Sequence, residues 1–517
     1  MQLQVVLNQP PGSHYTNLDT ITGRVLLQLA SNTTVSSITV KLEGESRTRL
    51  VAPAKPEYGN SRPKPVLELH KILYKTLVVF PPSQLQDADW QSHNYTLNPG
   101  NYEYPFQFKL PFNNACHANK SRASNIPFTS NLGFAGFPLD VATPPTRHVK
   151  QTLPPSLTGF PGEAEVRYYV KCTVNRPSLL KENPRAFSHF NFLPIEPPRP
   201  PKADGEAYAR RQHQFNPHWV PPSERRTSFF GKLGKDRPQS MDDSARVEPP
   251  RFSIDARLPN PAILTLNDDV PLRLIVKQLN ERTEPLYLQM LQIELVGYTA
   301  VRAHQVSRTE SSSWLLASMS NMNIPVGAPS DVPGTETPIN REYWSDRPLP
   351  NSVAPSFDTC NLSRYYELEV RVGLGYASYK QGQDQLIILP LRLPVKVFSG
   401  IAPPPELLQK MATGAFPRRK PVPGSAAPSP LATDFGHAGP SAPTTPLEGG
   451  TNPFPHAQPM PQGSYLPPQA AHGYEDAPPS YEDAVAVDIP PVDGPRRDYV
   501  PPPVPEDAPR FSHDEKR

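Results

Sequence analysis

The clearest chemical signal in the chain is a short proline motif, Pro478-Pro479-Ser480-Tyr481. Two adjacent prolines hold the backbone in polyproline II, so little conformational entropy remains to be lost on binding. WW domains bind such a ribbon in an aromatic groove, where a tyrosine at this spacing fills a second pocket. Composition alone gives about 0.2 such motifs in a segment this rich in proline. We therefore predict that Pro478, Pro479, Ser480 and Tyr481 bind a WW domain.

Two weaker variants of the motif occur elsewhere. Tyr474-Glu475-Asp476-Ala477 repeats as Tyr481-Glu482-Asp483-Ala484, but the first copy lacks the proline pair. Lys55-Pro56-Glu57-Tyr58 is a looser variant. Residues 471–495 include six acidic residues and no Lys or Arg, which favours an extended, solvated segment around the main motif. We expect at most a weak secondary site at Tyr474.

Two arginine-containing strings are typical of basophilic kinase substrates. They are Arg225-Arg226-Thr227-Ser228 and Arg237-Pro238-Gln239-Ser240, which make Thr227, Ser228 and Ser240 candidate phosphorylation sites. A phosphate would add about −2 charge beside the arginines, and a phosphopeptide reader such as a 14-3-3 protein could then bind. The same basic stretch is also compatible with contact to anionic lipid headgroups or with a plain solvated linker.

The sequence offers little that could perform catalysis. Gly231-Lys232-Leu233-Gly234-Lys235 lacks the spacing of a phosphate-binding loop, and neither a Gly-x-Ser-x-Gly nor a His-Glu-x-x-His string occurs. Cys116, Cys172 and Cys360 are isolated in the sequence, which argues against a zinc site. Cys172 alternates with apolar residues and is expected in the core. We predict a protein that is not an enzyme and has no cofactor, no bound metal and no assigned role for its histidines.

The first 400 residues read as short β-strands, because apolar residues recur at every second position. Thr39, Lys41 and Glu43 are expected on a solvated face, and Pro105 indicates an edge or a bend. We find no ten-residue amphipathic helix in this part, and a short helical turn is predicted just after it, near 406–411. The alternating apolar sets are Val25, Leu27, Leu29; Ile38, Val40, Leu42; Val166, Tyr168, Val170, Cys172, Val174; Phe252, Ile254, Ala256, Leu258; Leu291, Ile293, Leu295; and Leu391, Leu393, Val395, Val397.

This pattern predicts an all-β fold of two tandem immunoglobulin-like sandwiches, over residues 1–198 and 251–398. Residues 199–250 are rich in Pro, Arg and Ser and are predicted to be a basic linker. Residues 399–517 contain 27 prolines and four tyrosines in 119 positions, too few apolar residues for a core, so a disordered proline-rich tail is expected. The polar runs 113–151 and 307–361 read as long loops.

Charge and composition limit the partners and the compartment. The net charge is +3, from 52 basic and 49 acidic residues, which argues against nucleic acid as the main partner. Three cysteines in 517 residues do not form a disulfide framework, which favours a reducing compartment. No apolar run approaches ~18 residues, and the first residues lack a signal-peptide pattern. We expect a cytoplasmic protein.

Several strings, in this order and spacing, resemble the fungal α-arrestins, the arrestin-related trafficking adaptors. The similarity covers about 1–198 and 251–398. The strings are Thr22-Gly23-Arg24-Val25, Leu153-Pro154-Pro155-Ser156-Leu157, Glu165-Val166-Arg167-Tyr168-Tyr169-Val170-Lys171, Asn175-Arg176-Pro177, Phe192-Leu193-Pro194-Ile195-Glu196-Pro197-Pro198, Phe252-Ser253-Ile254, Leu258-Pro259-Asn260-Pro261 and Pro271-Leu272-Arg273-Leu274.

The resemblance implies two arrestin-type sandwiches and an adaptor function. Such an adaptor recruits a WW-domain HECT ubiquitin ligase to a plasma-membrane transporter or receptor, so that ubiquitin is attached to this cargo and endocytosis follows. The expected location is then the cytoplasm, with peripheral recruitment to the plasma membrane and endosomes. The alternative is an ambient-pH signalling arrestin, a scaffold that links a membrane sensor to the endosomal sorting machinery.

Overall fold

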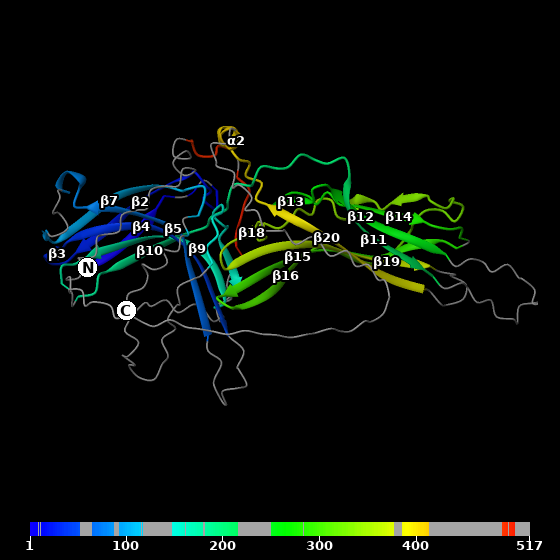
Figure 1. Ribbon diagram of the computed structural model, residues 1–517, viewed down its shortest axis with the longest axis horizontal. Coiled ribbons are helices and arrows are strands. Elements are labelled where there is room, and N and C mark those ends of the chain that lie inside the picture. Colours follow the sequence, from blue (N-terminus) through cyan, green and yellow to red (C-terminus); the bar gives the residue numbers. More distant parts are fainter. Residues whose placement is uncertain are drawn as a thin grey trace, which may run out of the picture.

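The computed structural model describes residues 1–51, 65–86, 93–114, 116, 147–178, 181–215, 250–376, 385–412 and 489–501, except positions 9, 11, 161, 283 and 495. Its strands form two elongated lobes that lie end to end (Figure 1). We call the part built from residues 2–190 the N lobe and the part built from residues 206–398 the C lobe. No helix among the described residues has the length and apolar composition that a membrane crossing requires.

The N lobe is a β-sandwich of antiparallel sheets around one apolar core. The three-stranded sheet has the order β1 (Gln2–Leu7), β2 (Thr20–Leu29), β7 (Gly100–Lys109). The second sheet has the order β10 (Arg185–Phe190), β9 (Ala164–Asn175), β4 (Ser37–Val51), β5 (Pro65–Phe80), with β8 (Leu157–Phe160) paired to β9. A short pair, β3 (Thr33–Val35) and β6 (Tyr95–Leu97), and the 3-10 turn η1 (Ser83–Leu85) complete the lobe.

The C lobe repeats this plan with larger sheets. Four strands have the order β11 (Glu206–Gln214), β12 (Arg251–Pro259), β14 (Arg273–Gln278), β17 (Glu336–Pro338). The other sheet has the order β13 (Ile263–Thr265), β20 (Gln385–Phe398), β19 (Leu362–Tyr376), β15 (Leu286–Ala303), β16 (Val306–Pro325), with β18 (Phe357–Asp358) paired to β19. The 3-10 turn η4 (Arg341–Tyr343) follows β17. The predicted all-β class with two sandwiches is confirmed.

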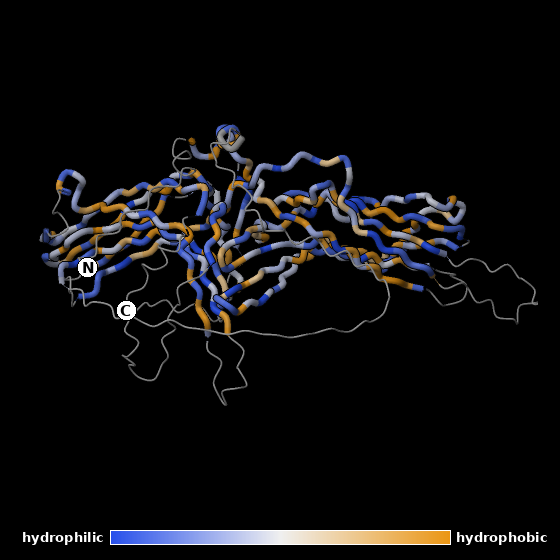
Figure 2. The backbone as a smooth tube through the Cα atoms, viewed as in Figure 1, coloured by the Kyte–Doolittle hydropathy of each residue, from blue (hydrophilic) through white to orange (hydrophobic). Residues whose placement is uncertain are grey.

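Two-residue periodicity explains most of these strands. Apolar and polar residues alternate along them (Figure 2), and Val25, Val40 and Val170 are fully buried as predicted. Pro105 lies in β7, which pairs only with β2 and is therefore an edge strand, as its missing N–H suggested. The prediction that one face of β4 is solvated is wrong, because Thr39 and Glu43 are buried. Side chains of the neighbouring strands cover this face.

Two expected connections are strands instead. The run 307–361, which reads as a loop, contains β16, which pairs with β15 through a two-residue turn after Ala303. The predicted linker 199–250 contains β11, which pairs with β12 along its whole length. Arg210 on β11 forms an ion pair with Asp255 on β12 at 2.6 Å. Both strands are rich in exposed polar residues because each lies at the edge of its sheet, so composition alone reads them as loops.

Part of the expected tail is also packed. The helical turn predicted near 406–411 is confirmed as helix α2 (Pro405–Ala412), in which Leu407 is fully buried. Residues 489–501, which we call the strap, lie against both lobes, and Ile489 and Tyr499 have no exposed surface. The expectation of disorder does not hold for the strap, because buried apolar side chains and ion pairs fix it.

The two lobes also contact each other directly, through polar groups. Ser46 on β4 donates to Asn361 Oδ1 in the C lobe at 2.7 Å, and Thr48 donates to the Arg302 carbonyl at 2.6 Å. Arg302 on β15 reaches back to Glu68 on β5, with 2.8 Å between Nη2 and Oε1. These hydrogen bonds fix how β4 and β5 meet β15 and β19.

Candidate functional site

The residues that the sequence singled out lie outside the described part of the chain. These are the WW-domain ligand Pro478, Pro479, Ser480 and Tyr481 and the candidate phosphorylation sites Thr227, Ser228 and Ser240. Their roles therefore stay predictions. The described residues instead bring together a groove on the N lobe, the strap, and a buried group of cysteine and histidine side chains.

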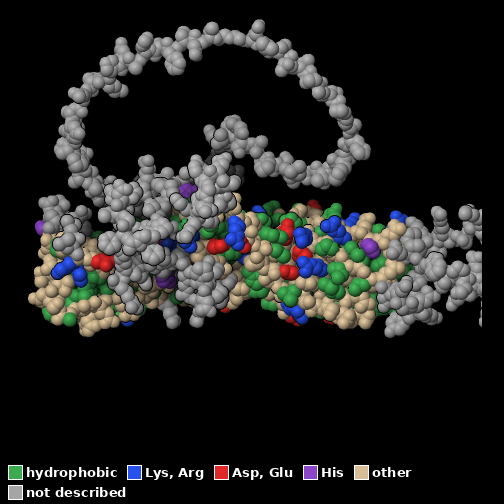
Figure 3. All heavy atoms as spheres, turned by 90° about the horizontal axis from the view of Figure 1, so that it is seen from below, with side chains coloured by type: hydrophobic (Ala, Val, Ile, Leu, Met, Phe, Trp, Pro, Cys, Tyr) green, Lys and Arg blue, Asp and Glu red, His purple; other side chains and the backbone are tan. Residues whose placement is uncertain are grey.

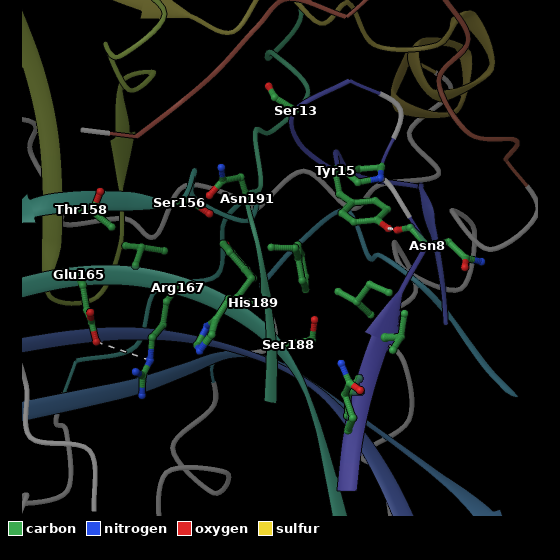
Figure 4. Close-up of a pocket in the computed structure, with 18 residues that line it drawn as sticks. Asn8, Ser13, Tyr15, Ser156, Thr158, Glu165, Arg167, Ser188, His189 and Asn191 are labelled. Atoms are coloured by element: carbon green, nitrogen blue, oxygen red, sulfur yellow. Dashed lines mark hydrogen bonds and ion pairs between the residues drawn. The ribbon is translucent and has the colours of Figure 1, made fainter. Parts of the chain in front are cut away.

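The groove has a volume of about 770 Å³ and is lined by β1, β9 and β10 (Figure 4). Strands β1 and β10 are each at the edge of their sheet. Val5, Tyr168 and Phe190 supply apolar lining, while Ser188 and Asn191 supply polar groups. An edge strand presents backbone donors and acceptors to an incoming chain, so this groove suits an extended peptide that adds main-chain hydrogen bonds.

The charges beside the groove are paired within the protein. Arg167 Nη2 lies 3.0 Å from Glu45 Oε2, and Arg167 Nε lies 3.5 Å from Glu165 Oε1. Burial alone would raise the pKa of Glu45, but Arg167 and Arg47 lower it below its ordinary value. Because the acidic and basic side chains of the lining compensate each other, shape and main-chain hydrogen bonds would dominate recognition here.

An ion pair and a buried ring are among the contacts that anchor the strap to the N lobe. Arg496 forms two hydrogen bonds with the Asp19 carboxylate, at 2.5 and 2.7 Å, and both side chains are at most 6% exposed. The Tyr499 hydroxyl donates to the Ser156 carbonyl, and Ser13 Oγ donates to the Tyr499 carbonyl at 3.3 Å. Ser13 and Ser156 also line the groove, so the strap contacts two residues of its lining.

The C-lobe contacts of the strap are more exposed. Arg497 pairs with Asp268 at 2.5 Å, and these side chains are 31% and 48% exposed. Asn267 donates to the Asp498 carbonyl at 2.9 Å, and Asn351 donates to the Asp498 carboxylate at 2.8 Å. The strap therefore bridges the lobes through buried contacts with the N lobe and more exposed contacts with the C lobe.

One titratable group lies directly under the strap. His14 is fully buried, and its ring meets the Tyr499 ring edge-on with 6.4 Å between centroids. Burial, followed by the positive charge of Arg496, lowers the pKa of His14 to about 4, although Asp19 and Asp498 act in the opposite direction. His14 is therefore neutral while the strap is in place at neutral pH.

The surface of the C lobe mixes charged and apolar side chains (Figure 3). On the six-stranded sheet, Glu369 pairs with Arg371 at 2.6 Å and with Arg392 at 3.0 Å. Leu386 and Ile388 of the same sheet are exposed. A surface of this composition suits a protein partner better than a polyanion, which requires clustered positive charge.

Four side chains that the sequence left without a role lie together where the lobes meet. They are His70, Cys116, His148 and Cys360, and within the described residues they form the one group of His, Cys, Asp or Glu that could hold a metal ion. Cys172, by contrast, is in the N-lobe core as expected, and burial raises the pKa of its thiol to about 12. The isolated positions of the cysteines in sequence gave no sign of this group.

Sequence reasoning also missed the strap. Its only local signal is that Ile489 and Tyr499 are large apolar residues in a proline-rich, charged stretch, beside the adjacent pair Arg496 and Arg497. The groove has no local motif, because it arises from three strands that are far apart in the chain. Only the tertiary fold brings these residues together.

Comparison with known proteins shows that the first part of the chain is similar to arrestins. The family profile described as Arrestin (or S-antigen), N-terminal domain, matches residues 3–131. An Arrestin-related trafficking adapter 10 of Candida glabrata is 30% identical over 128 residues, which cover 23% of this chain and 25% of that protein. A protein of the same name from Eremothecium gossypii is 25% identical over 222 residues, 38% of this chain and 46% of that protein. The chain thus aligns with less than half of each relative, and the resemblance found in the sequence is confirmed.

Proposed function

We propose that this chain, an arrestin-fold protein related to the fungal α-arrestins, is a trafficking adaptor without catalytic activity of its own. It brings a WW-domain HECT ubiquitin ligase to a membrane transporter or receptor, and ubiquitination of that cargo then promotes its endocytosis. The observation that carries the proposal is the arrestin N-terminal domain at residues 3–131 followed, in the same chain, by Pro478-Pro479-Ser480-Tyr481. One part selects the cargo, and the other recruits the enzyme.

The groove between β1 and β10 is the proposed cargo contact. Its edge strands and its mixed apolar and polar lining suit an extended segment of a membrane protein. Its paired charges mean that the segment need not be strongly acidic or basic. A peptide in this groove would add a strand to the N lobe, with side-chain pockets at alternate positions supplying specificity.

The ligase contact is weak when it acts alone, since a four-residue motif buries far less than a standard interface. A second contact, of adaptor with cargo or of ligase with membrane, would raise the effective concentration. The complex would therefore assemble at a cargo-bearing membrane, and we propose a cytoplasmic protein that is recruited peripherally to the plasma membrane and endosomes. Phosphorylation at Thr227, Ser228 or Ser240 and 14-3-3 binding would regulate this recruitment, and ubiquitin would be attached to cargo and adaptor.

The proposal is tested by comparing two tyrosines that share the same following residues. We expect Tyr481→Ala in the full chain to abolish capture by immobilised WW domains of a HECT ligase, because the second pocket loses its side chain. Tyr474→Ala is the matched control, since Tyr474 precedes the same Glu-Asp-Ala string but has no proline pair, and it should bind like the unmodified chain. Equal capture of the unmodified chain and Tyr481→Ala would refute the ligase contact.

Cargo selection needs a separate readout. Proximity labelling in cells should recover the ligase with the unmodified chain but not with Tyr481→Ala, whereas membrane transporters or receptors should be recovered with both. Recovery of endosomal sorting proteins with no transporter or receptor in either sample would instead favour the signalling scaffold. The ligase arm and the cargo arm of the proposal can therefore fail independently.

A further inference from the structure

The buried cysteine and histidine group draws its members from four separate places in the chain. His70 is on β5, Cys116 follows β7, His148 precedes β8, and Cys360 lies between β18 and β19. The first three belong to the N lobe and the fourth to the C lobe. Their nitrogen and sulfur atoms all lie within 4.8 Å of one another.

The distances within the group match the edges of a small tetrahedron. Cys116 Sγ lies 3.3 Å from His70 Nδ1, 3.2 Å from His148 Nδ1 and 3.7 Å from Cys360 Sγ. A tetrahedral Zn²⁺ with Zn–S of about 2.3 Å and Zn–N of about 2.0–2.1 Å separates two sulfurs by about 3.8 Å and a sulfur from a nitrogen by about 3.6 Å. The observed separations agree with these values to within a few tenths of an ångström.

The donor set also selects the metal. Two thiolates and two imidazoles are the soft and borderline ligands that favour Zn²⁺ over Mg²⁺ or Ca²⁺, which prefer oxygen. His70, Cys116 and Cys360 are buried and His148 is half-buried. Four protein ligands with little access for water are typical of a structural site, since a catalytic zinc keeps one position open. Two thiolates would also neutralise the charge of the ion.

Hydrogen-bonding groups around the four side chains fix the orientation of two of them. Glu68 Oε1 lies 2.7 Å from His70 Nε2, which leaves His70 Nδ1 directed at Cys116. The Val149 N–H donates to Cys360 Sγ at 3.1 Å. A carboxylate behind a ligating histidine is the usual device that fixes its tautomer and orientation.

We propose that His70, Cys116, His148 and Cys360 bind one Zn²⁺ ion that joins the N lobe to the C lobe. The ion adds a fixed link beside the hydrogen bonds of Ser46 and Arg302, at the same junction. Its role is structural: it holds the angle between the sandwiches. This differs from the expectation, drawn from the isolated cysteines, that the chain has no zinc site.

The first test is metal content. The full chain, purified under reducing conditions without chelator, should contain about one zinc per chain by mass spectrometry of the metal. Cys360→Ser and His148→Ala should each lose most of this zinc, whereas Cys172→Ala, which removes the third buried thiol, should keep it. His148 is only half-buried, so its variant tests the site even if Cys360→Ser does not fold. Zinc-free protein, or equal zinc in His148→Ala and Cys172→Ala, overturns the proposal.

Three further measurements separate the zinc site from a plain thiol cluster. Cobalt substituted for zinc should give the absorption of a tetrahedral thiolate complex, and this should disappear in His148→Ala. A chelator should lower the melting temperature of the unmodified chain and of Cys172→Ala but not that of His148→Ala. Glu68→Gln should raise the Kd for zinc about 10–100-fold. If Cys116 and Cys360 resist alkylation until a reductant is added, the two thiols form a disulfide. That result would contradict the site.

Discussion

Among the described residues, the direct junction and the strap both link the lobes, and these two contacts are built differently. At the direct junction, Glu68 is fully buried and accepts hydrogen bonds from Arg302 and from the His304 N–H. Its partners all belong to strands or to turns between strands. At the strap, Tyr499 is fully buried and the Arg496 side chain is 6% exposed, but both belong to a segment that forms no strand of either sandwich. The junction is part of the two sandwiches, whereas the strap is added to them.

This difference predicts different consequences of breaking each contact. Loss of the junction removes hydrogen bonds that fix β5 against β15, so the whole body should lose stability. Loss of the strap uncovers Asp19 and His14 but leaves every strand pair intact. Local opening of a short segment with few anchors requires less free energy than global unfolding. We therefore expect the strap to be the contact that can open.

The largest effect is expected at the junction. Glu68→Ala leaves Arg302 without its buried carboxylate and should lower the free energy of unfolding by about 3–5 kcal/mol. Chemical denaturation of the full chain measures this. Glu206→Ala, which removes a carboxylate from the half-exposed pair with Arg273, is the control and should cost under about 1 kcal/mol. Equal losses in the two variants would show that the junction is not special.

A smaller and more local effect is expected at the buried ion pair between the strap and the N lobe. Arg496→Ala leaves the Asp19 carboxylate buried without its partner, and strap docking should weaken by about 3 kcal/mol. Amide hydrogen exchange in residues 489–501 should become about 100-fold faster, with the strand cores unchanged. If exchange in β4 and β9 accelerated equally, the strap would be part of the cooperative core and the comparison would fail.

Acid should weaken the contact between the strap and the N lobe, where His14 lies. The pKa of His14 is about 4 in the folded protein and about 6.5 in an unfolded chain. At pH above 6.5 the ring is neutral in both states, and as pH falls towards 4 only the unfolded state takes up the proton, so stability decreases. The loss between pH 7 and pH 5 should be about 2 kcal/mol. Denaturation curves at the two pH values should show a smaller loss for His14→Gln, and identical losses would exclude His14 as the cause.

The smallest effect is expected one residue further along. Arg497→Ala removes a partly exposed ion pair with Asp268 and should change strap docking by under about 1 kcal/mol. The same hydrogen-exchange measurement in residues 489–501 should show only a few-fold change. Because Arg496 and Arg497 are adjacent, the pair separates burial from charge. A loss at Arg497 as large as that at Arg496 would mean that burial does not set the strength of these anchors.

The fold could be predicted where one face of a strand is buried and the other is wet. Val166 to Val174 alternates cleanly, and β9 forms as expected. Strands β11 and β16 could not be predicted from alternation, because they lie at sheet edges and expose polar residues on both sides. Their existence depends on β12 and β15 offering unpaired backbone groups, which is a property of the partner strand. The buried Glu43 was missed for a related reason, since the residues that cover it come from β5 and β9.

The candidate sites were predictable only where the chemistry is local. Pro478-Pro479-Ser480-Tyr481 is a contiguous motif, so the sequence alone proposes it as a ligand, and this stays a prediction. The four side chains around Cys116 come from positions 70, 116, 148 and 360, and no local spacing links them. The same is true of Asp19 and Arg496, which are 477 positions apart. Sites assembled from distant residues require the fold before they can be recognised.

The position of the strap limits how far the ligase motif can reach. Tyr481 precedes Ile489 by eight positions, and a chain of that length spans at most about 29 Å. While Ile489 is seated on the body, a WW domain bound to the proposed ligand would therefore be tethered within a small radius of the contact between Ile489 and Lys109. Release of the strap would remove the anchor at Ile489, so the motif could reach beyond that radius, and a recruited ligase could modify a larger set of lysines.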